Sequence, residues 1–154
     1  MLAAGASTRY GGVKQHDLLP AVLVALQQSS VDEIVVVEGA HPLRTDARVV
    51  PCPDWERGPG ASLRCGLAAL GDDVERAVIV LADGPELDPR AVDRLAESEA
   101  PVAAATYDGR TRNHPVALDR SAWADIPDEG GRALDPVLVD CSDLQAPGDV
   151  DVRP

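Results

Sequence analysis

The first residues of the chain combine small side chains with two cations. The stretch Leu2–Lys14 reads Leu-Ala-Ala-Gly-Ala-Ser-Thr-Arg-Tyr-Gly-Gly-Val-Lys and contains no acidic residue. Small residues let a backbone approach a ligand closely, and successive N–H groups in a glycine-rich turn form a concavity that binds anions. The planar guanidinium of Arg9 and the mobile ammonium of Lys14 both suit phosphate oxygens. The stretch therefore predicts a loop that cradles a triphosphate. The alternative is an exposed turn whose glycines serve only the bend.

A carboxylate follows directly on an apolar run. Ala77–Ala82 is entirely apolar, and Asp83 comes next, before Gly84. A carboxylate at the end of a buried strand is fixed in place and poorly solvated, which suits Mg²⁺, a hard cation that keeps several waters. One carboxylate rarely holds Mg²⁺ alone, so a second oxygen ligand is expected. The alternative is a plain turn, because Asp-Gly is a common turn dipeptide.

Other sequence motifs of phosphate binding and catalysis do not occur in this sequence. Gly12–Gln15 does not end as a P-loop does, and Gly58–Leu63 lacks the third glycine of GxGxxG. No HExxH or GxSxG motif occurs. The glycine-rich stretch and Asp83 thus remain as the candidates for chemistry.

The composition narrows the possible partners. The 154 residues amount to about one domain, and 45% hydrophobic with 26% charged residues is typical of a soluble globular protein. Residues 1–70 carry six basic and seven acidic groups, whereas residues 71–154 carry eight and 19, and the net charge is −12. Such a charge repels nucleic acid and anionic membranes. The first 16 residues, however, hold Arg9 and Lys14 and no acid, and a small positive segment of this kind suits a small anionic ligand better than a polymer.

The same composition predicts where in the cell the protein is found and whether its cysteines are free thiols. No apolar run reaches the ~18 residues of a membrane span, and no signal peptide is visible. We therefore expect a cytoplasmic protein, a monomer or weak dimer, with neither nucleic-acid nor membrane partners. Cys52, Cys65 and Cys141 have no CxxC spacing, which predicts free thiols in a reducing compartment rather than a disulfide or a zinc site.

Strands and helices are predicted to alternate along the chain. Fully apolar, non-alternating runs indicate strands that are covered on both faces. The expected strands are the end at Met1–Ala4 and residues 33–38, 48–51, 77–82, 102–107, 116–118 and 137–140. The expected helices are residues 18–28, 60–70, 89–98 and 121–125. This order favours an α/β fold with a mostly parallel sheet between helices, in which ligands bind beyond the carboxyl ends of the strands.

The motifs resemble those of one known family. The first stretch matches LAAGxSxRxGxxK, the signature of the MobA-like NTP transferases. Four further segments that resemble the family's motifs follow in its order: residues 53–67, Leu81–Pro85, His114–Val116 and Asp149–Asp151. The resemblance is closest to the molybdenum-cofactor cytidylyltransferases and covers essentially the whole chain. It implies one nucleotidyltransferase domain over residues 1–154, with a Rossmann-like three-layer α/β/α sandwich and a mostly parallel, mixed sheet.

The resemblance also implies an activity and a role for each site residue. The family transfers a nucleoside monophosphate from an NTP to a phosphorylated acceptor, with Mg²⁺ as cofactor and pyrophosphate as product. Arg9 and Lys14 would hold the triphosphate, and Asp83 with Asp151 would hold the metal. His114 would lie near the acceptor and Ser62 near the base. The nucleotide-binding residues implied in this way are Leu2, Ala3, Ala4, Gly5, Ser7, Arg9, Lys14 and Ser62.

Because the sequence departs from the family pattern at several positions, it does not specify the identity of the acceptor. Met1 falls almost on the first motif, so either the start is misassigned or trimmed or the first strand is shortened. The chain stops at Pro154, so the helix that follows the family's closing motif is expected to be lost. Gly84 replaces the family's Gln, and Asn113 its Gly. Ala4 resembles the branch that uses CTP, with a molybdopterin-type acceptor. The alternatives are another phosphorylated acceptor, such as a sugar or polyol phosphate or a phospholactate, and a nucleotide-binding protein without turnover.

Overall fold

The strands form two hydrogen-bonded groups. The computed structural model describes residues 1–124 and 126–151. One group pairs two parallel strands, β1 (Val35–Glu38) and β2 (Arg48–Pro51). The other has the order β3 (Arg76–Ile79), β5 (Asn113–Asp119), β4 (Val102–Thr106) and β6 (Val137–Asp140). In it β5 runs antiparallel to both neighbours, whereas β4 and β6 are parallel.

The chain start joins the two groups into one layer. Leu2 bridges in parallel to Val37 of β1 on one side and to Leu81, just beyond β3, on the other. The Leu2 amide donates to the Val80 carbonyl over 2.9 Å, and the Ala3 amide donates to the Val37 carbonyl over 3.0 Å. The strand end expected at Met1–Ala4 is thus a short extended segment between the two groups of strands. Among the described residues, β5 is the one antiparallel strand.

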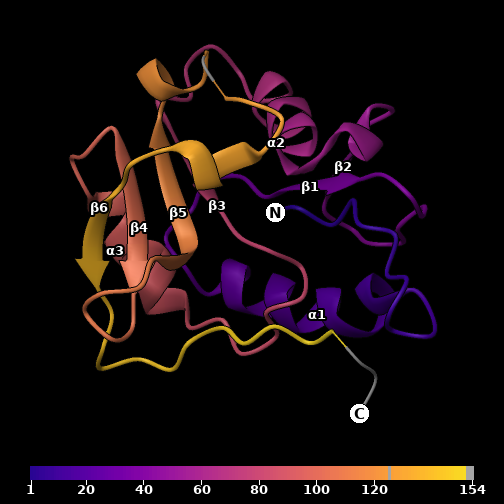
Figure 1. Cartoon of the computed structure of the whole chain (residues 1–154), viewed down its shortest axis with the longest axis horizontal. Helices are drawn as coiled ribbons and strands as arrows, with labels where there is room; N and C mark the ends of the chain where they lie inside the picture. The colour runs from indigo at the N-terminus through magenta and orange to yellow at the C-terminus, as the bar shows by residue number, and fades with distance from the viewer. Residues whose placement is uncertain (125, 152–154) are drawn as a thin grey trace.

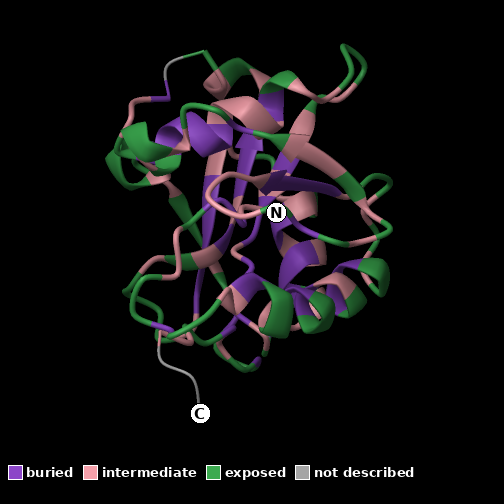
Figure 2. Cartoon of the chain, turned by 90° about the vertical axis from the view of Figure 1, so that its right-hand side faces the viewer, coloured by how far each residue is buried: buried purple, intermediate pink, exposed green. Residues whose placement is uncertain are grey.

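Helices cover both faces of this sheet, as the alternation of side chains shows. Val80 beside β3 packs with Val22 of α1 (Lys14–Gln27) and Val92 of α3 (Pro89–Glu97). Ile79 instead packs with Leu63 of α2 (Pro59–Ala68) on the opposite face. Figure 1 shows α2 at the end of the molecule away from α1, and Figure 2 shows the buried residues gathered between the exposed helix faces. The expected three-layer α/β/α arrangement is confirmed.

Two helix predictions need correction. The first helix begins at Lys14 and not at Leu18, so that Pro20 lies inside it rather than in its first turn. The earlier start is stabilised by Gln15, which is buried on the same side as Leu19. The helix expected over residues 121–125 is only a 3-10 turn, Arg120–Ala122, and residue 125 lies outside the described part of the chain. Two further 3-10 turns are η1 (Trp55–Arg57) and η3 (Gly130–Ala133).

The prediction of free thiols is wrong for two cysteines. Cys52 and Cys65 form a disulfide, with their Cα atoms 5.7 Å apart. The sequence spacing hid this pair because packing of α2 against the end of β2 brings the two residues together. Cys141 is a free thiol, as expected, and it is buried.

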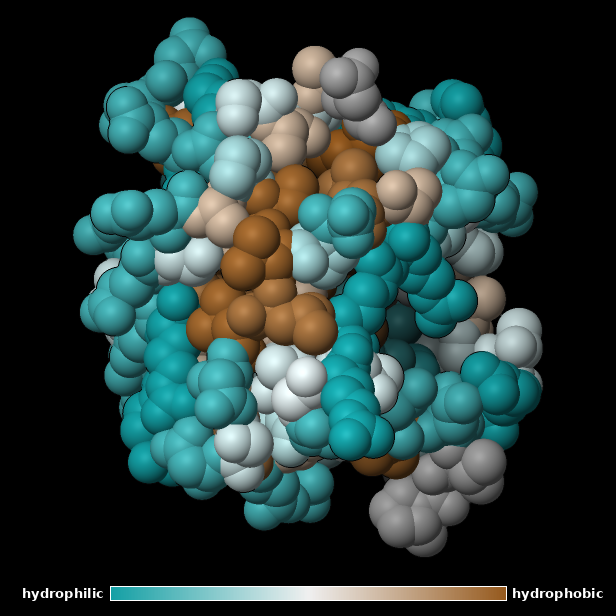
Figure 3. All heavy atoms as spheres, turned by 60° about the vertical axis from the view of Figure 1, so that its left-hand side comes forward, coloured by the Kyte–Doolittle hydropathy of each residue, from teal (hydrophilic) through white to brown (hydrophobic). Residues whose placement is uncertain are grey.

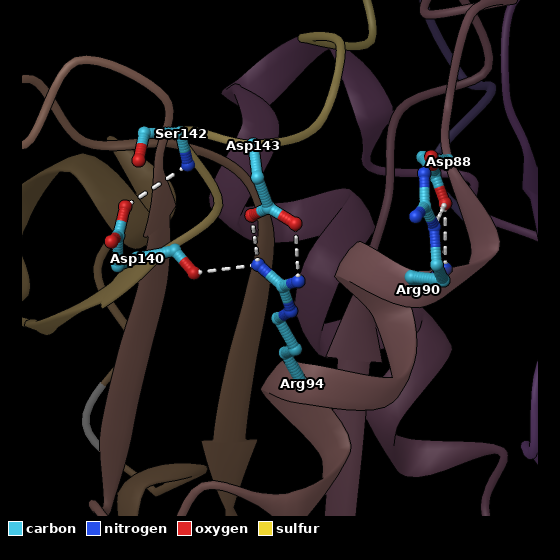
Figure 4. Close-up of polar contacts among 6 residues, drawn as sticks. All are labelled: Asp88, Arg90, Arg94, Asp140, Ser142 and Asp143. Carbon is cyan, nitrogen blue, oxygen red and sulfur yellow. Dashed lines mark hydrogen bonds and ion pairs between the residues drawn. The ribbon is translucent and has the colours of Figure 1, made fainter.

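An arginine fixes α3 to the segment that follows β6. Figure 4 shows Arg94 directed at Asp140 and Asp143. Its guanidinium donates to the Asp140 carbonyl over 3.0 Å and to both carboxylate oxygens of Asp143, over 2.6 and 2.8 Å. At the other end of α3, the Asp88 side chain caps the helix by accepting from the Arg90 amide. The hydrogen bonds from Arg94 lower the pKa of Asp143 from 3.8 to about 2.

We expect the stability lost in Arg94→Ala to depend on pH. Because the folded pKa of Asp143 lies below its ordinary value, its ion pair stabilises the fold above about pH 4 and is lost as the pH falls to about 2. Thermal unfolding of both proteins between pH 7 and pH 2 measures this. The midpoint of the variant should lie below that of the parent at pH 7, and the gap should narrow towards pH 2. A gap that stays constant would contradict the assignment.

The surface carries few large apolar side chains. No helix in the described part is long and apolar enough to cross a membrane. Val137 and Leu138 of β6 are both exposed. Figure 3 brings the side of the molecule with β6 forward and shows apolar residues gathered at the centre of a hydrophilic face.

Candidate functional site

A cavity of about 390 Å³ lies at the carboxyl ends of the central strands. It is formed by the glycine-rich stretch, the start of α1, the segment around the start of α2, and the residues that follow β3. Its lining is Leu2, Ala3, Ala4, Gly5, Ser7, Thr8, Arg9, Tyr10, Lys14, Gln15, Trp55, Gly58, Pro59, Ser62, Leu81, Ala82, Asp83 and Asp151. We call it the nucleotide cavity. All the residues that the sequence assigned to nucleotide and metal line it.

Four charged side chains meet at this cavity. The Lys14 ammonium lies 2.7 Å from Asp83 and 3.7 Å from Asp151. The Arg9 guanidinium lies 2.9 Å from the other oxygen of Asp151. The side chains of Lys14 and Asp83 are 15% and 22% exposed, whereas Arg9 is 75% exposed. Two cations and two carboxylates therefore balance each other, with Lys14 and Asp83 at the protected end.

Residues 147–151, called here the closing segment, lie beside Asp83 because hydrogen bonds join them to the loop after β3. The Val150 amide donates to the Asp83 carbonyl, and the Glu86 amide to the Pro147 carbonyl, each over 3.1 Å. A Cβ atom on Gly84 would lie 3.0 Å from the Pro147 side chain. Gly84 therefore allows the two segments to lie close together, which gives a physical reason for its replacement of the family's Gln. This contact brings Asp151 to the cavity.

A buried glutamine, which the sequence reasoning missed, holds the glycine-rich loop in shape. Gln15 donates from Nε2 to the Gly5 carbonyl and accepts from the Ser7 hydroxyl, both over 2.7 Å. Ser7 has φ 54°, a left-handed conformation that is costly for a residue with a side chain. Its hydroxyl also accepts from the Lys14 amide over 3.3 Å. These bonds compensate for the strain and connect the loop to the start of α1.

Ser62 and Trp55 close the cavity on the side of α2. Ser62 is buried in the first turn of the helix, whose N-cap is Gly58. Ser62 is therefore not the capping residue of α2. Trp55 packs so closely that a Cβ atom on Gly39 would lie 2.7 Å from it. The Trp55 side chain also borders the cavity.

The structure places His114 apart from these residues. It is the second residue of β5, which begins at Asn113 and not at residue 116 as expected from sequence. It lines a separate cavity of about 450 Å³, which shares Leu2, Pro59 and Leu81 with the nucleotide cavity. The pKa of His114 is lowered to about 4, mainly by burial; the charge of Asp83 opposes this shift, and the charges of Arg112 and Arg132 add to it. The imidazole is therefore neutral near pH 7.

The carboxylates fit a hard divalent cation. Oxygens of Asp83 and Asp151 both approach the same Lys14 ammonium, so one positive centre already lies between them. No group of three His, Cys, Asp or Glu side chains that could hold a metal occurs within residues 1–124 and 126–151. The protein would therefore supply two carboxylates and leave the other positions to water and phosphate, as Mg²⁺ prefers.

A glycine-rich anion loop that faces an acidic strand end across one sheet defines a class of α/β nucleotide-binding enzymes. The model of the MobA-like NTP transferase domain matches residues 1–135, and the chain belongs to this family. It is a nucleotidyltransferase with the family's Rossmann-like fold. No curated protein matches the sequence.

Solved structures resemble the chain over nearly its full length. Rv0371c from Mycobacterium tuberculosis H37Rv is 26% identical with a TM-score of 0.78, covering 98% of this chain and 90% of that one. Its homologue from Mycobacterium sp. strain JC1 is 22% identical with a TM-score of 0.78, covering 99% and 88%. A nucleotidyl transferase from Methanothermobacter, Mth528, is 22% identical with a TM-score of 0.68, covering 84% and 75%.

Proposed function

We propose that the enzyme transfers CMP from CTP to a phosphorylated small molecule, with Mg²⁺ as cofactor. The observation that carries this proposal is the convergence of Lys14, Asp83 and Asp151 at one cavity lined by the glycine-rich loop. A triphosphate needs cations along its oxygens, and a metal needs carboxylates beside them. This cavity offers both within a few ångströms.

The two cations would bind the triphosphate and the departing pyrophosphate. Lys14 is protected and held by the start of α1, so its position is fixed before the substrate arrives. Arg9 is exposed on the loop and would close over the outer phosphates. Negative charge develops on phosphate oxygens as pyrophosphate leaves, and preorganised cations stabilise it. On substrate binding, both would exchange carboxylate partners for phosphate oxygens.

Asp83 and Asp151 would hold the metal. Bound Mg²⁺ neutralises phosphate charge and aligns the α-phosphorus for in-line attack. Asp83 belongs to the sheet and would fix the position, while Asp151 would complete the site from the closing segment. A structure of Rv0371c from Mycobacterium tuberculosis H37Rv is a complex with manganese, which supports divalent-metal binding in the family.

Ser62 and the segment Leu2–Gly5 would face the base of the nucleotide. A buried hydroxyl beside the cavity can donate to or accept from a base edge, and small residues at Leu2–Gly5 leave room for the ring. The preference for CTP follows from the resemblance of the LAAG sequence to the cytidylyltransferase branch. A molybdopterin-type phosphate is the first acceptor to test, and a sugar phosphate, polyol phosphate or phospholactate the next.

The acceptor would approach from the side of His114. Because the two cavities share Leu2, Pro59 and Leu81, a ligand in the second cavity would lie next to a nucleotide in the first. We further propose that residues 1–154 act as one domain, as a monomer or weak dimer, in the cytoplasm where nucleoside triphosphates are abundant.

Release of pyrophosphate tests the proposal. Each of the four NTPs is incubated with Mg²⁺ and each acceptor class, and a thermal-shift assay follows binding of the NTP with and without Mg²⁺. We expect CTP to give the fastest release with a phosphorylated acceptor and the largest Mg²⁺-dependent shift. Nucleotide stabilisation with no turnover on any acceptor would instead favour a binding protein, and GTP preference would contradict the choice of base.

A further inference from the structure

The cavity that His114 lines is called here the acceptor cavity. Its floor is apolar. Side chains from three elements form it: Leu63 of α2, Ile79 of β3, and Val116 and Leu118 of β5. Leu63, Ile79 and Leu118 belong to one buried cluster, and Val116 packs against it. Leu63, Ile79 and Leu118 are buried, so the floor continues into the core, and the half-buried Val116 presents its exposed aliphatic surface. The floor offers few hydrogen-bonding groups to a polyhydroxylated ligand.

Cations without carboxylate partners lie at the rim of this cavity. Arg112 donates to the carbonyls of Leu134 and Gly131, over 2.8 and 3.0 Å, which fixes its guanidinium. Arg132 is exposed on η3. In the described part of the chain, neither guanidinium has a carboxylate within ion-pair distance. Most of the other described arginines do, as expected for a chain with a net charge of −12.

The remaining rim groups do not cancel these cations. Glu129 and Asp149 also line the cavity, and water screens their exposed side chains as it screens the exposed side chain of Arg132. His114 is neutral near pH 7 and can serve as a hydrogen-bonding group. An anion that enters therefore finds the fixed guanidinium of Arg112 and the exposed one of Arg132, neither of which has an ion-pair partner among the described residues, above an apolar surface.

We propose that the acceptor is a phosphomonoester with a mainly apolar carbon body, bound with its body on the aliphatic floor and its phosphate near Arg112 and Arg132. Arg132 is then a specificity-determining residue for the acceptor. This inference rests on the proposed nucleotidyl transfer. A phosphate oxygen of the acceptor attacks the α-phosphorus of the NTP, the bond to the β-phosphate breaks, and pyrophosphate leaves with the bonding electron pair. The product joins the nucleoside monophosphate and the acceptor by a new P–O–P linkage.

A panel of simple phosphates tests the acceptor class. Hexyl phosphate and phenyl phosphate are compared with glycerol 3-phosphate and glucose 1-phosphate at saturating CTP and Mg²⁺. Each buried CH₂ group contributes about 0.8 kcal/mol, or roughly fourfold in binding, so kcat/KM should be at least about tenfold higher for the apolar acceptors. Faster turnover of the two polar phosphates would overturn the inference while the proposed function would stand. No turnover on any of these four phosphates would overturn the inference, and the proposed function would be overturned only if the wider acceptor panel described above also failed.

Two variants test the cavity itself. Arg132→Ala should raise the KM for hexyl phosphate about tenfold and leave the KM for CTP unchanged. Arg110→Ala is the matched control, because Arg110 is also exposed but lies outside the cavity. Val116→Thr preserves shape but adds a hydroxyl to the floor, and it should raise the KM for hexyl phosphate more than for glycerol 3-phosphate. Unchanged acceptor KM values in both cavity variants would overturn the inference.

Discussion

Asp83→Asn is expected to abolish nucleotidyl transfer and leave the protein folded. The substitution keeps the size of the side chain but removes the charge that faces Lys14 at 2.7 Å. It would also remove the proposed metal ligand that belongs to the sheet. Loss of a single preorganised electrostatic group costs on the order of 10²–10³ in rate, and loss of a metal ligand adds to this. We therefore expect kcat to fall by roughly 10³ or more.

Pyrophosphate release at saturating CTP and Mg²⁺ measures this loss, with circular dichroism as the check on folding. Asp46→Asn is the matched control, because Asp46 is an exposed aspartate outside the cavities described above. The control should keep the activity of the parent. The metal assignment is wrong if Asp83→Asn turns over at the full rate, or if its Mg²⁺-dependent thermal shift equals that of the parent.

Lys14→Ala should lower kcat on the order of 10²–10³, the cost of removing one preorganised cation from a site where charge develops. The side chain is 15% exposed, so water replaces it poorly. Lys14→Arg should recover part of the rate, since the charge returns on a longer, planar group. Steady-state kinetics on the three proteins measure the effect. Arg44→Ala is the control, because Arg44 is an exposed cation outside the nucleotide cavity.

The chain offers an independent check on this second prediction. Lys14 is the only lysine, so Lys14 and the α-amino group of Met1 are the two targets of an amine-reactive reagent. Peptide mapping separates them, and CTP with Mg²⁺ should protect Lys14. Modification at the same rate with and without CTP would place Lys14 outside the nucleotide site, as would a Lys14→Ala protein with normal kinetics.

Much of the site could be predicted from the sequence because its parts are local. The apolar run Ala77–Ala82 ends at Asp83, and the glycine-rich stretch ends at Lys14, so each group occurs at a recognisable boundary. Parallel strands bring their carboxyl ends to one edge, which is enough to expect that the two groups meet. The alternation of strands and helices predicted the layers for the same reason.

The rest depends on long-range packing that local patterns do not encode. Gln15 looks like an ordinary polar residue until α1 buries it beneath the glycine-rich loop. Cys52 and Cys65 become neighbours only through the packing of α2. Arg112 and His114 are separated by one residue, but only the fold joins them to Arg132 in one cavity.

The two ends of the described chain lie in contact with β1 and with the nucleotide cavity. The Met1 amino nitrogen is buried and donates to the Val35 carbonyl over 2.7 Å, and Asp151 pairs with Arg9 beside the cavity. An affinity tag joined to Met1 would begin beside β1, and one joined directly to Asp151 would begin beside the nucleotide cavity. Purification handles should therefore be cleaved before assay, or placed in the exposed turn at Gly109.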